Sequence, residues 1–341
     1  MGAGVLAAVL LAGRAGAEPP IDSGPRDAVV ATTTDAEAPS PIERITTIGA
    51  SATAGFGVNF WRFEGEDRKV RDSTNLAKIL RAAADDRIVV SSLGTGQFFL
   101  NPEGLGTLVV DRVLRRPPDL VVAIDFLFWF TYGTVGPDAR PMRTKIERLE
   151  MLEHGLALLD RLHRAGLPIV IGDIPDMSRA AGRILLRSQV PDEETRLAAN
   201  RRIAAWRAER PSVRFLSLDR LQRLLQGDGP IEIAGEPVPD SERPYLLQGD
   251  RLHPTVGGLS IIAGELLSML AADAELGDRL PPIAIDYAEL VERVTGLPAM
   301  RLQESLERAY LRDREAAMQA DRAGEDDREH DRDPASESAP R

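Results

Sequence analysis

The chain has 341 residues, 43% of them hydrophobic, and a formal net charge of −11. This length suffices for one large domain with extensions or for two small domains. The acidic balance argues against nucleic acids and anionic membrane surfaces as partners. Without cysteine, the chain has no disulfide framework, no thiolate nucleophile and no cysteine-based metal site. Four histidines are too few to suggest a histidine-rich metal centre; they are His154, His163, His253 and His330.

The N-terminal segment, residues 1–17, has the form of a signal peptide. A short apolar run from Val5 to Ala12 precedes small residues that end at Ala17. We therefore expect export to the periplasm or the extracellular space, with a cytoplasmic protein as the alternative because no Lys or Arg precedes the run. Residues 18–42 are rich in Pro, Thr, Ala and Asp, which is typical of a linker. No segment reaches the roughly 18 apolar residues of a membrane-spanning helix.

Strands and helices are predicted to alternate from residue 44 onward. Short apolar, β-branched runs predict the strands, and apolar residues at helical spacing predict the helices. In chain order we expect strand 44–50, helix 73–86 with Ser73 or Thr74 as N-cap, strand 87–94, helix 104–116, strand 119–130, helix 143–166, strand 167–176, helix 192–210, strand 212–218 and helix 255–272.

The predicted strands are continuously apolar rather than alternating, which indicates an α/β protein whose parallel sheet is covered by helices on both faces. Ligand sites in such sheets lie beyond the carboxyl ends of the strands. Residues 273–311 suggest a helical extension outside the alternation. From residue 312 to 341 the charges are mixed and apolar periodicity is absent, so a disordered tail is expected.

Two short motifs carry the residues of a nucleophilic site. Asp250 and His253 are three apart, so on a turn the carboxylate would reach the imidazole Nδ1–H and leave Nε2 as a base. Ser51 directly follows the first strand, and a serine hydroxyl attacks once a base removes its proton. Taken alone, the first motif is more often a surface turn and Ser51 more often a helix N-cap. Their combination favours catalysis.

These segments together resemble the SGNH (GDSL-type) hydrolase family over about residues 44–271. Gly49-Ala50-Ser51 resembles the first block of the family, and Gly94 in "SSLGTG" resembles the second. The sequence "DRLHPTVGG", which begins at Asp250, matches the fourth block most closely. For residues 43–272 the resemblance implies a flavodoxin-like three-layer α/β/α sandwich with a parallel sheet. It also implies hydrolysis of an ester or thioester, or acyl transfer, with no cofactor or metal.

The resemblance further implies a role for each matched residue. Ser51 would attack the acyl carbonyl, and His253 would take its proton and deliver it to the leaving alkoxide. Asp250 would orient His253. The N–H groups of Ser51 and Gly94 would donate to the oxyanion.

Asp125 stands where the family has its oxyanion-hole Asn, and Ala50 replaces the usual Asp beside the nucleophile. Three interpretations of Asp125 are open. Protonated within its apolar strand, Asp125 would donate its O–H to the oxyanion. Held away by backbone N–H groups, it would leave two donors and a slower enzyme. In the third interpretation, the protein binds an acyl or sugar ligand without turning it over.

Aromatic residues follow both Asp125 and the nucleophile and are candidates for pocket walls or core positions. They are Phe126, Phe128, Trp129, Phe130 and Tyr132, and on a predicted loop Phe60, Trp61 and Phe63. The sequence thus predicts a serine esterase that hydrolyses a small acyl ester, an O-acetyl carbohydrate or a short lipid ester, through an acyl-enzyme. The alternatives are a non-catalytic ligand-binding protein on the same fold and an O-acyltransferase with the same triad. Nothing in the sequence indicates the oligomeric state.

Overall fold

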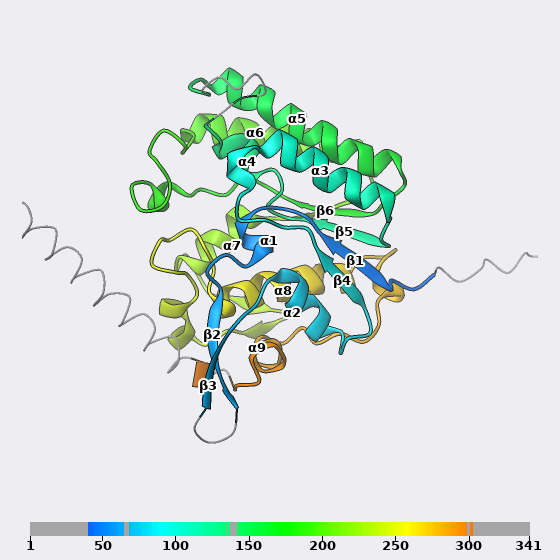
Figure 1. Cartoon of the computed structure of the whole chain (residues 1–341), viewed down its shortest axis with the longest axis vertical. Helices are drawn as coiled ribbons and strands as arrows, with labels where there is room; N and C mark the ends of the chain where they lie inside the picture. The colour runs from blue at the N-terminus through cyan, green and yellow to red at the C-terminus, as the bar shows by residue number, and fades with distance from the viewer. Residues whose placement is uncertain (1–39, 65–67, 135, 137–141, 299–300, 303–341) are drawn as a thin grey trace, which may run out of the picture. The chain divides into compact units, whose positions relative to one another are not determined.

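A computed structural model describes residues 40–64, 68–134, 136, 142–298 and 301–302. In this part of the chain, five parallel strands form the central sheet in the order β4-β1-β5-β6-β7 (Figure 1). In sequence order of these strands the arrangement is 2-1-3-4-5, which is flavodoxin-like. The predicted fold class is therefore confirmed. The strands are β1 (Arg44–Thr47), β4 (Val89–Ser92), β5 (Leu120–Ala123), β6 (Ile169–Gly172) and β7 (Val213–Leu216).

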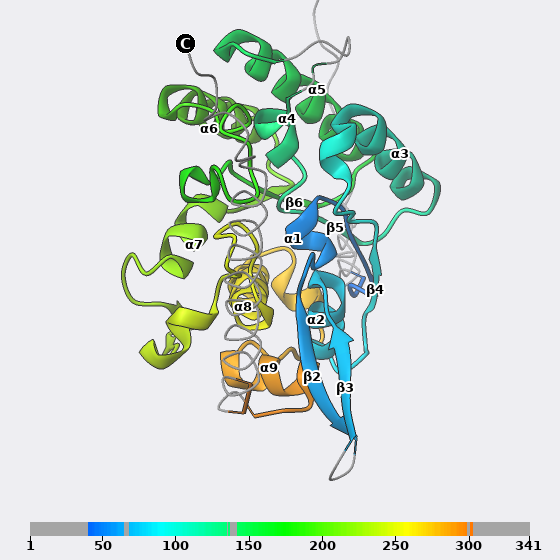
Figure 2. The ribbon, with the colours of Figure 1, turned by 60° about the vertical axis from the view of Figure 1, so that its left-hand side comes forward.

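Helices cover both faces of the sheet (Figures 1 and 2). On one face lie α3 (Pro102–Arg115), α4 (Phe128–Tyr132), α5 (Lys145–Arg164) and α6 (Glu193–Ala208). On the other lie α2 (Leu76–Ala83), α7 (Leu218–Leu225), α8 (Val256–Ala271) and α9 (Tyr287–Thr295). Successive residues of β5 enter the two cores in turn, so the whole strand is buried and apolar.

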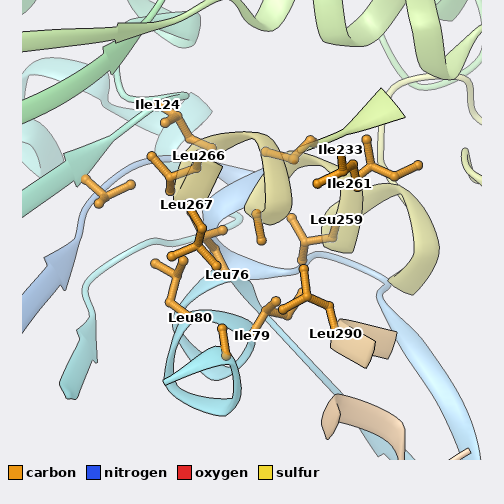
Figure 3. Close-up of a cluster of buried hydrophobic side chains, with 14 of the residues drawn as sticks. Leu76, Ile79, Leu80, Ile124, Ile233, Leu259, Ile261, Leu266, Leu267 and Leu290 are labelled. Carbon is orange, nitrogen blue, oxygen red and sulfur yellow. The ribbon is translucent and has the colours of Figure 1, made fainter. Parts of the chain in front are cut away.

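The core beneath α2, α8 and α9 includes the C-terminal extension. Leu80 of α2, Leu259 and Leu266 of α8, and Leu290 of α9 point toward one another in Figure 3 and are fully buried. Residues 273–297 therefore pack on the same core as the sheet. Residues 1–39, with the predicted signal peptide and most of the predicted linker, and residues 303–341, with the predicted tail, lie outside the described part. The predicted linker ends too late, because its last residue, Ile42, is buried in the core. Within the described residues, no helix is long and apolar enough to cross a membrane.

The predicted strand 119–130 is wrong in its second half. The strand ends at Ala123, and the chain turns into α4 at Phe128. An apolar run shows no period when both faces of an element are buried, so the sequence could not separate strand from helix here. The N-cap of α2 also differs from the prediction, because the Asn75 side chain accepts the Lys78 N–H at 2.9 Å.

Several short elements were not predicted from the sequence. An antiparallel hairpin of β2 (Asn59–Glu64) and β3 (Arg68–Ser73) lies beside α9 (Figure 2). Phe60 of this hairpin is buried in the core, so it is not a pocket wall. The Phe63 side chain lies outside the described part. The remaining elements are α1 (Ser51–Ala54), the antiparallel pair β8 (Glu232–Ile233) and β9 (Glu236–Pro237), and short 3-10 helices at Phe98–Leu100, Ser178–Ala180, Asp240–Tyr245 and Gly277–Arg279.

Candidate active site

The carboxyl ends of three adjacent strands bring the predicted residues together. Ser51 begins α1 directly after β1, Gly94 follows β4, and Asp125 follows β5. A Cβ atom at Gly94 would lie 2.7 Å from Thr53 Cγ2, so this glycine packs directly against α1. His253 comes from the loop before α8, and it lines one pocket together with Ser51 and Asp125. Ser51 and His253, which are some two hundred residues apart in the sequence, thus lie at the same edge of the sheet.

Asp250 and His253 form the contact that their spacing predicts. Asp250 Oδ2 lies 2.7 Å from His253 Nδ1, and its Oδ1 accepts the N–H groups of Leu252 and His253 at 2.9 and 3.0 Å. Arg251 adopts a left-handed φ of 62°, which closes this turn. Burial opposes ionisation of Asp250, but the hydrogen bonds from His253 and Leu252 outweigh it, and its pKa lies below the usual range. The buried imidazole therefore faces a carboxylate.

Gln248 ties the histidine segment to the nucleophile segment. Its Nε2 donates to Phe56 O at 2.8 Å and to Pro254 O at 2.9 Å. A Cβ atom at Gly57 would lie 2.5 Å from Gln248 Oε1, so a glycine is needed where the two segments meet. The Phe56 ring also contacts the His253 ring, with centroids 4.7 Å apart. Sequence reasoning singled out neither Gln248 nor Phe56, because each acts across a large separation in the chain.

The Ser51 and Gly94 N–H groups are available at this edge. Within the described residues neither has a hydrogen-bond acceptor, whereas the N–H groups of Ala50, Ala52 and Thr53 are all bonded. No hydrogen bond joins Ser51 to His253 in the described part, although both line the same two pockets. Such bonds often tighten only when substrate is bound.

The Asp125 carboxylate holds the turn that carries Ser51. Oδ1 accepts the Ala50 N–H at 3.0 Å and the Thr53 hydroxyl at 2.5 Å. Oδ2 accepts the N–H groups of Ala52 and Thr53 at 2.9 and 3.1 Å. Both oxygens thus face donors on the nucleophile turn, as the second interpretation from the sequence requires, and neither is left to donate to an oxyanion. Thr53, whose hydroxyl completes the set, was not singled out in the sequence.

Gly49 makes the close approach of Asp125 possible. A Cβ atom at this position would lie 2.0 Å from Asp125 Oδ1, and the residue has a φ of 154°. Burial raises the pKa of Asp125, while the Thr53 hydroxyl and the three backbone N–H groups lower it in part. The absence of a side chain at Gly49 therefore admits the neighbouring carboxylate.

Ser51 and His253 lie between two pockets of different size. The narrower pocket has a volume of about 50 Å³ and the wider one about 250 Å³, and both also contact Leu252. The narrower pocket is lined by apolar side chains of α4, α7, α8 and the turn after β6, which include Phe128, Met177, Leu218, Leu221, Leu225 and Ile262. The walls of the wider pocket include Phe56, Phe99, Trp129, Ile184, Leu185 and Gln189.

Among the five aromatic residues that follow Asp125, two line pockets and three are fully buried. Phe128 lines the narrower pocket and Trp129 the wider one. Phe126, Phe130 and Tyr132 are fully buried. The Tyr132 hydroxyl donates to Pro175 O at 2.8 Å and accepts the Met177 N–H at 2.9 Å, which fixes one wall of the narrower pocket.

Helix α7, which lines the narrower pocket, was not predicted, although the sequence contains the pattern of a helix there. Leu218, Leu221 and Leu225 are spaced three and four residues apart. Ser217 caps the helix by accepting the Arg220 N–H, and Gly227 follows its end. This is an amphipathic helix of two turns with regular start and stop signals.

Comparisons with known proteins give structural likenesses at low identity. No family model and no curated protein matches the sequence. Similar solved structures include a mutant of an acetyl-xylooligosaccharide esterase from Geobacillus Stearmophilus (16% identity, TM-score 0.43, 69% of this chain and 97% of the other). They also include a candidate lipolytic protein of the G-D-S-L family from Desulfitobacterium hafniense DCB-2 (13%, 0.42, 67% and 99%). A third is the psychrotrophic esterase EstA from Pseudoalteromonas sp. (15%, 0.38, 67% and 96%).

We predict that Asp125→Asn lowers kcat/KM by about 10²-fold, the order of loss expected when a catalytic group is misplaced by about 1 Å. The amide would turn an N–H toward donors on the nucleophile turn, which costs about 1–3 kcal/mol of stability. Kinetics on a short acyl ester and urea unfolding measure the two effects. Thr53→Val removes one of the four bonds and should cost less. Activity that is kept or raised near neutral pH would instead make residue 125 an oxyanion donor.

A second prediction concerns the pH dependence that Asp250 contributes. Because its pKa is lowered in the folded state, the carboxylate stabilises the fold above the unfolded-state pKa, and this contribution is lost as pH falls through the folded value. Asp250→Asn should flatten this acid limb in urea unfolding measured between pH 2 and 7. It should also lower kcat by about 10³- to 10⁴-fold, because the amide favours the wrong imidazole tautomer. An unchanged kcat would show that Asp250 has no role in catalysis.

Proposed function

We propose that the protein is a serine esterase that hydrolyses a short-chain acyl ester through an acyl-enzyme intermediate. The observation that carries the proposal is the shared wall of the two pockets. There Ser51 stands beside His253, whose Nδ1 is held by Asp250. This is the arrangement of nucleophile, base and orienting group that acyl transfer requires.

In the proposed reaction, Ser51 Oγ attacks the carbonyl carbon while His253 Nε2 takes its proton. The tetrahedral oxyanion would be bound by the N–H groups of Ser51 and Gly94. When the intermediate collapses, the imidazolium returns the proton to the departing alkoxide. A water molecule then attacks the acyl-enzyme with His253 again as base, which releases the carboxylic acid and restores Ser51. Asp250 keeps Nδ1 protonated throughout.

Asp125 acts in this proposal as a positioning residue. Its four accepted hydrogen bonds fix the turn of Ala50, Ala52 and Thr53, and thereby aim the Ser51 N–H. Two oxyanion donors then remain where three are usual. Loss of one such donor costs on the order of 10² to 10³ in rate, so we expect a modest kcat.

The sizes of the pockets support a short acyl group. A cavity of about 150 Å³ admits benzene, so the narrower pocket at about 50 Å³ has room for an acyl chain of only a few carbons. The wider pocket would receive the alcohol. Its wall includes the Trp129 side chain, whose buried Nε1 has no hydrogen-bond partner within the described residues.

A fluorophosphonate probe tests the nucleophile directly. The purified protein should be labelled at Ser51, and the label should disappear in Ser51→Ala. The same preparation should hydrolyse p-nitrophenyl acetate. Absence of both labelling and hydrolysis between pH 4 and 9 would favour a protein that only binds its ligand.

The variant Leu225→Ala tests whether the narrower pocket holds the acyl group. Leu225 is buried and lines the narrower pocket, so truncation should shift the ratio of kcat/KM from acetyl toward hexanoyl esters by about tenfold or more, the effect of one or two methylenes. Leu267→Ala, equally buried on α8 but outside both pockets, is the matched control for lost stability. An unchanged chain-length preference in Leu225→Ala would move the acyl group to the wider pocket.

A further inference from the structure

Large apolar side chains are exposed around the mouth of the wider pocket. Phe56, Phe99 and Ile184 line that pocket and are 48%, 44% and 42% exposed. Leu100 and Leu186, which neighbour the pocket residues Phe99 and Leu185 in sequence, are 62% and 65% exposed. Single exposed apolar residues are ordinary, whereas a cluster marks a surface of interaction. We call Phe56, Phe99, Leu100, Ile184 and Leu186 the apolar rim.

Exposed large apolar side chains are concentrated in the apolar rim and are not spread evenly over the surface. Nine large apolar side chains are exposed in the described part of the chain, and the five rim residues are among them. The other four are dispersed over β4, α3, α5 and α6, as Val89, Leu108, Ile146 and Leu197.

Arginines flank the rim in a chain that is otherwise acidic. Residues 177–191, read as "MSRAAGRILLRSQVP", contain Arg179, Arg183 and Arg187 and no acidic residue, although the whole chain has a net charge of −11. Arg179 lies 3.9 Å from Asp228, and Arg183 donates to Gly249 O. Arg187 is exposed and has no ion-pair partner within the described residues. Asp176 and Asp192 flank this stretch, so the excess of positive charge is confined to residues 177–191.

The base of this segment is fixed to the body of the protein. The buried Arg148 guanidinium donates to Ser188 O at 2.7 Å and to Gln189 O at 3.1 Å. Gln189 Oε1 in turn accepts the Leu186 N–H at 2.7 Å. The exposed side chains therefore project from an ordered loop, which presents apolar groups and cations side by side without a further cost of ordering.

We propose that the apolar rim docks on the anionic surface of a lipid bilayer. Apolar side chains that enter the acyl boundary beside arginines that pair with lipid phosphates are the combination that holds a protein at such an interface. Three rim residues, Phe56, Phe99 and Ile184, line the wider pocket, so a protein partner seated on them would close it. A bilayer would instead leave the pocket open to molecules within it, and the alcohol part of the substrate would be that of a lipid ester. Docking itself does not require the proposed hydrolysis.

Vesicle binding tests the docking surface. Full-length protein with Ser51→Ala, which separates binding from hydrolysis, is sedimented with phosphatidylcholine vesicles with or without phosphatidylglycerol. Binding should require the anionic lipid and weaken with salt. Leu100→Ser with Leu186→Ser should lower the partition coefficient at least tenfold, since each loses most of its apolar burial. Arg187→Gln should lower it about fivefold, the share of one cation near the surface.

Matched controls lie outside the rim. Ile146→Ser removes a side chain that is 69% exposed on α5, and Arg201→Gln removes an exposed cation on α6. Both should leave the partition coefficient unchanged. Failure of the parent protein to bind anionic vesicles, or equal binding by rim and control variants, would overturn the proposal. A concentration-dependent dimer that the double Leu variant abolishes, without vesicle binding, would assign the rim to a second copy of the chain.

Discussion

The hydrogen bonds between Asp125 and the nucleophile turn are the interaction on which the site depends. A buried carboxylate is costly unless donors surround it. Here three backbone N–H groups and the Thr53 hydroxyl do so, and the lack of a Cβ at Gly49 lets the carboxylate approach. The contact joins the ends of β1 and β5, so the geometry of Ser51 is coupled to the packing of the sheet.

The second half of the site is supported in a comparable way. His253 is held by the Asp250 carboxylate on a turn closed by Arg251. Gln248 then connects this turn to Phe56 O, shortly after the nucleophile turn that Asp125 holds. In both halves of the site, a neighbouring side chain forms hydrogen bonds with the backbone that carries the reactive residue. Acyl transfer requires this kind of preorganisation.

The two pockets beside the site have walls of different character. The narrower pocket is lined mainly by buried apolar side chains of α4, α7, α8 and the turn after β6. The wider pocket is bordered by the turn at Phe98–Leu100 and by the loop 177–191, which expose Phe99 and Ile184 at its wall. The net charge of the whole chain of 341 residues did not reveal the basic character of the loop 177–191. For a contact surface, charge within a Debye length of the partner matters more than the total.

The sequence by itself determined the alternation of strands and helices, because the continuous apolar strands and amphipathic helices are local patterns. It also predicted the Asp250–His253 contact, since three residues on a turn fix that distance. Only the tertiary structure decided the role of Asp125. Its partners are more than seventy residues away, and an apolar run cannot reveal where a strand ends. The same holds for Gln248 and for the apolar rim, whose members become neighbours only when the sheet and its loops have folded.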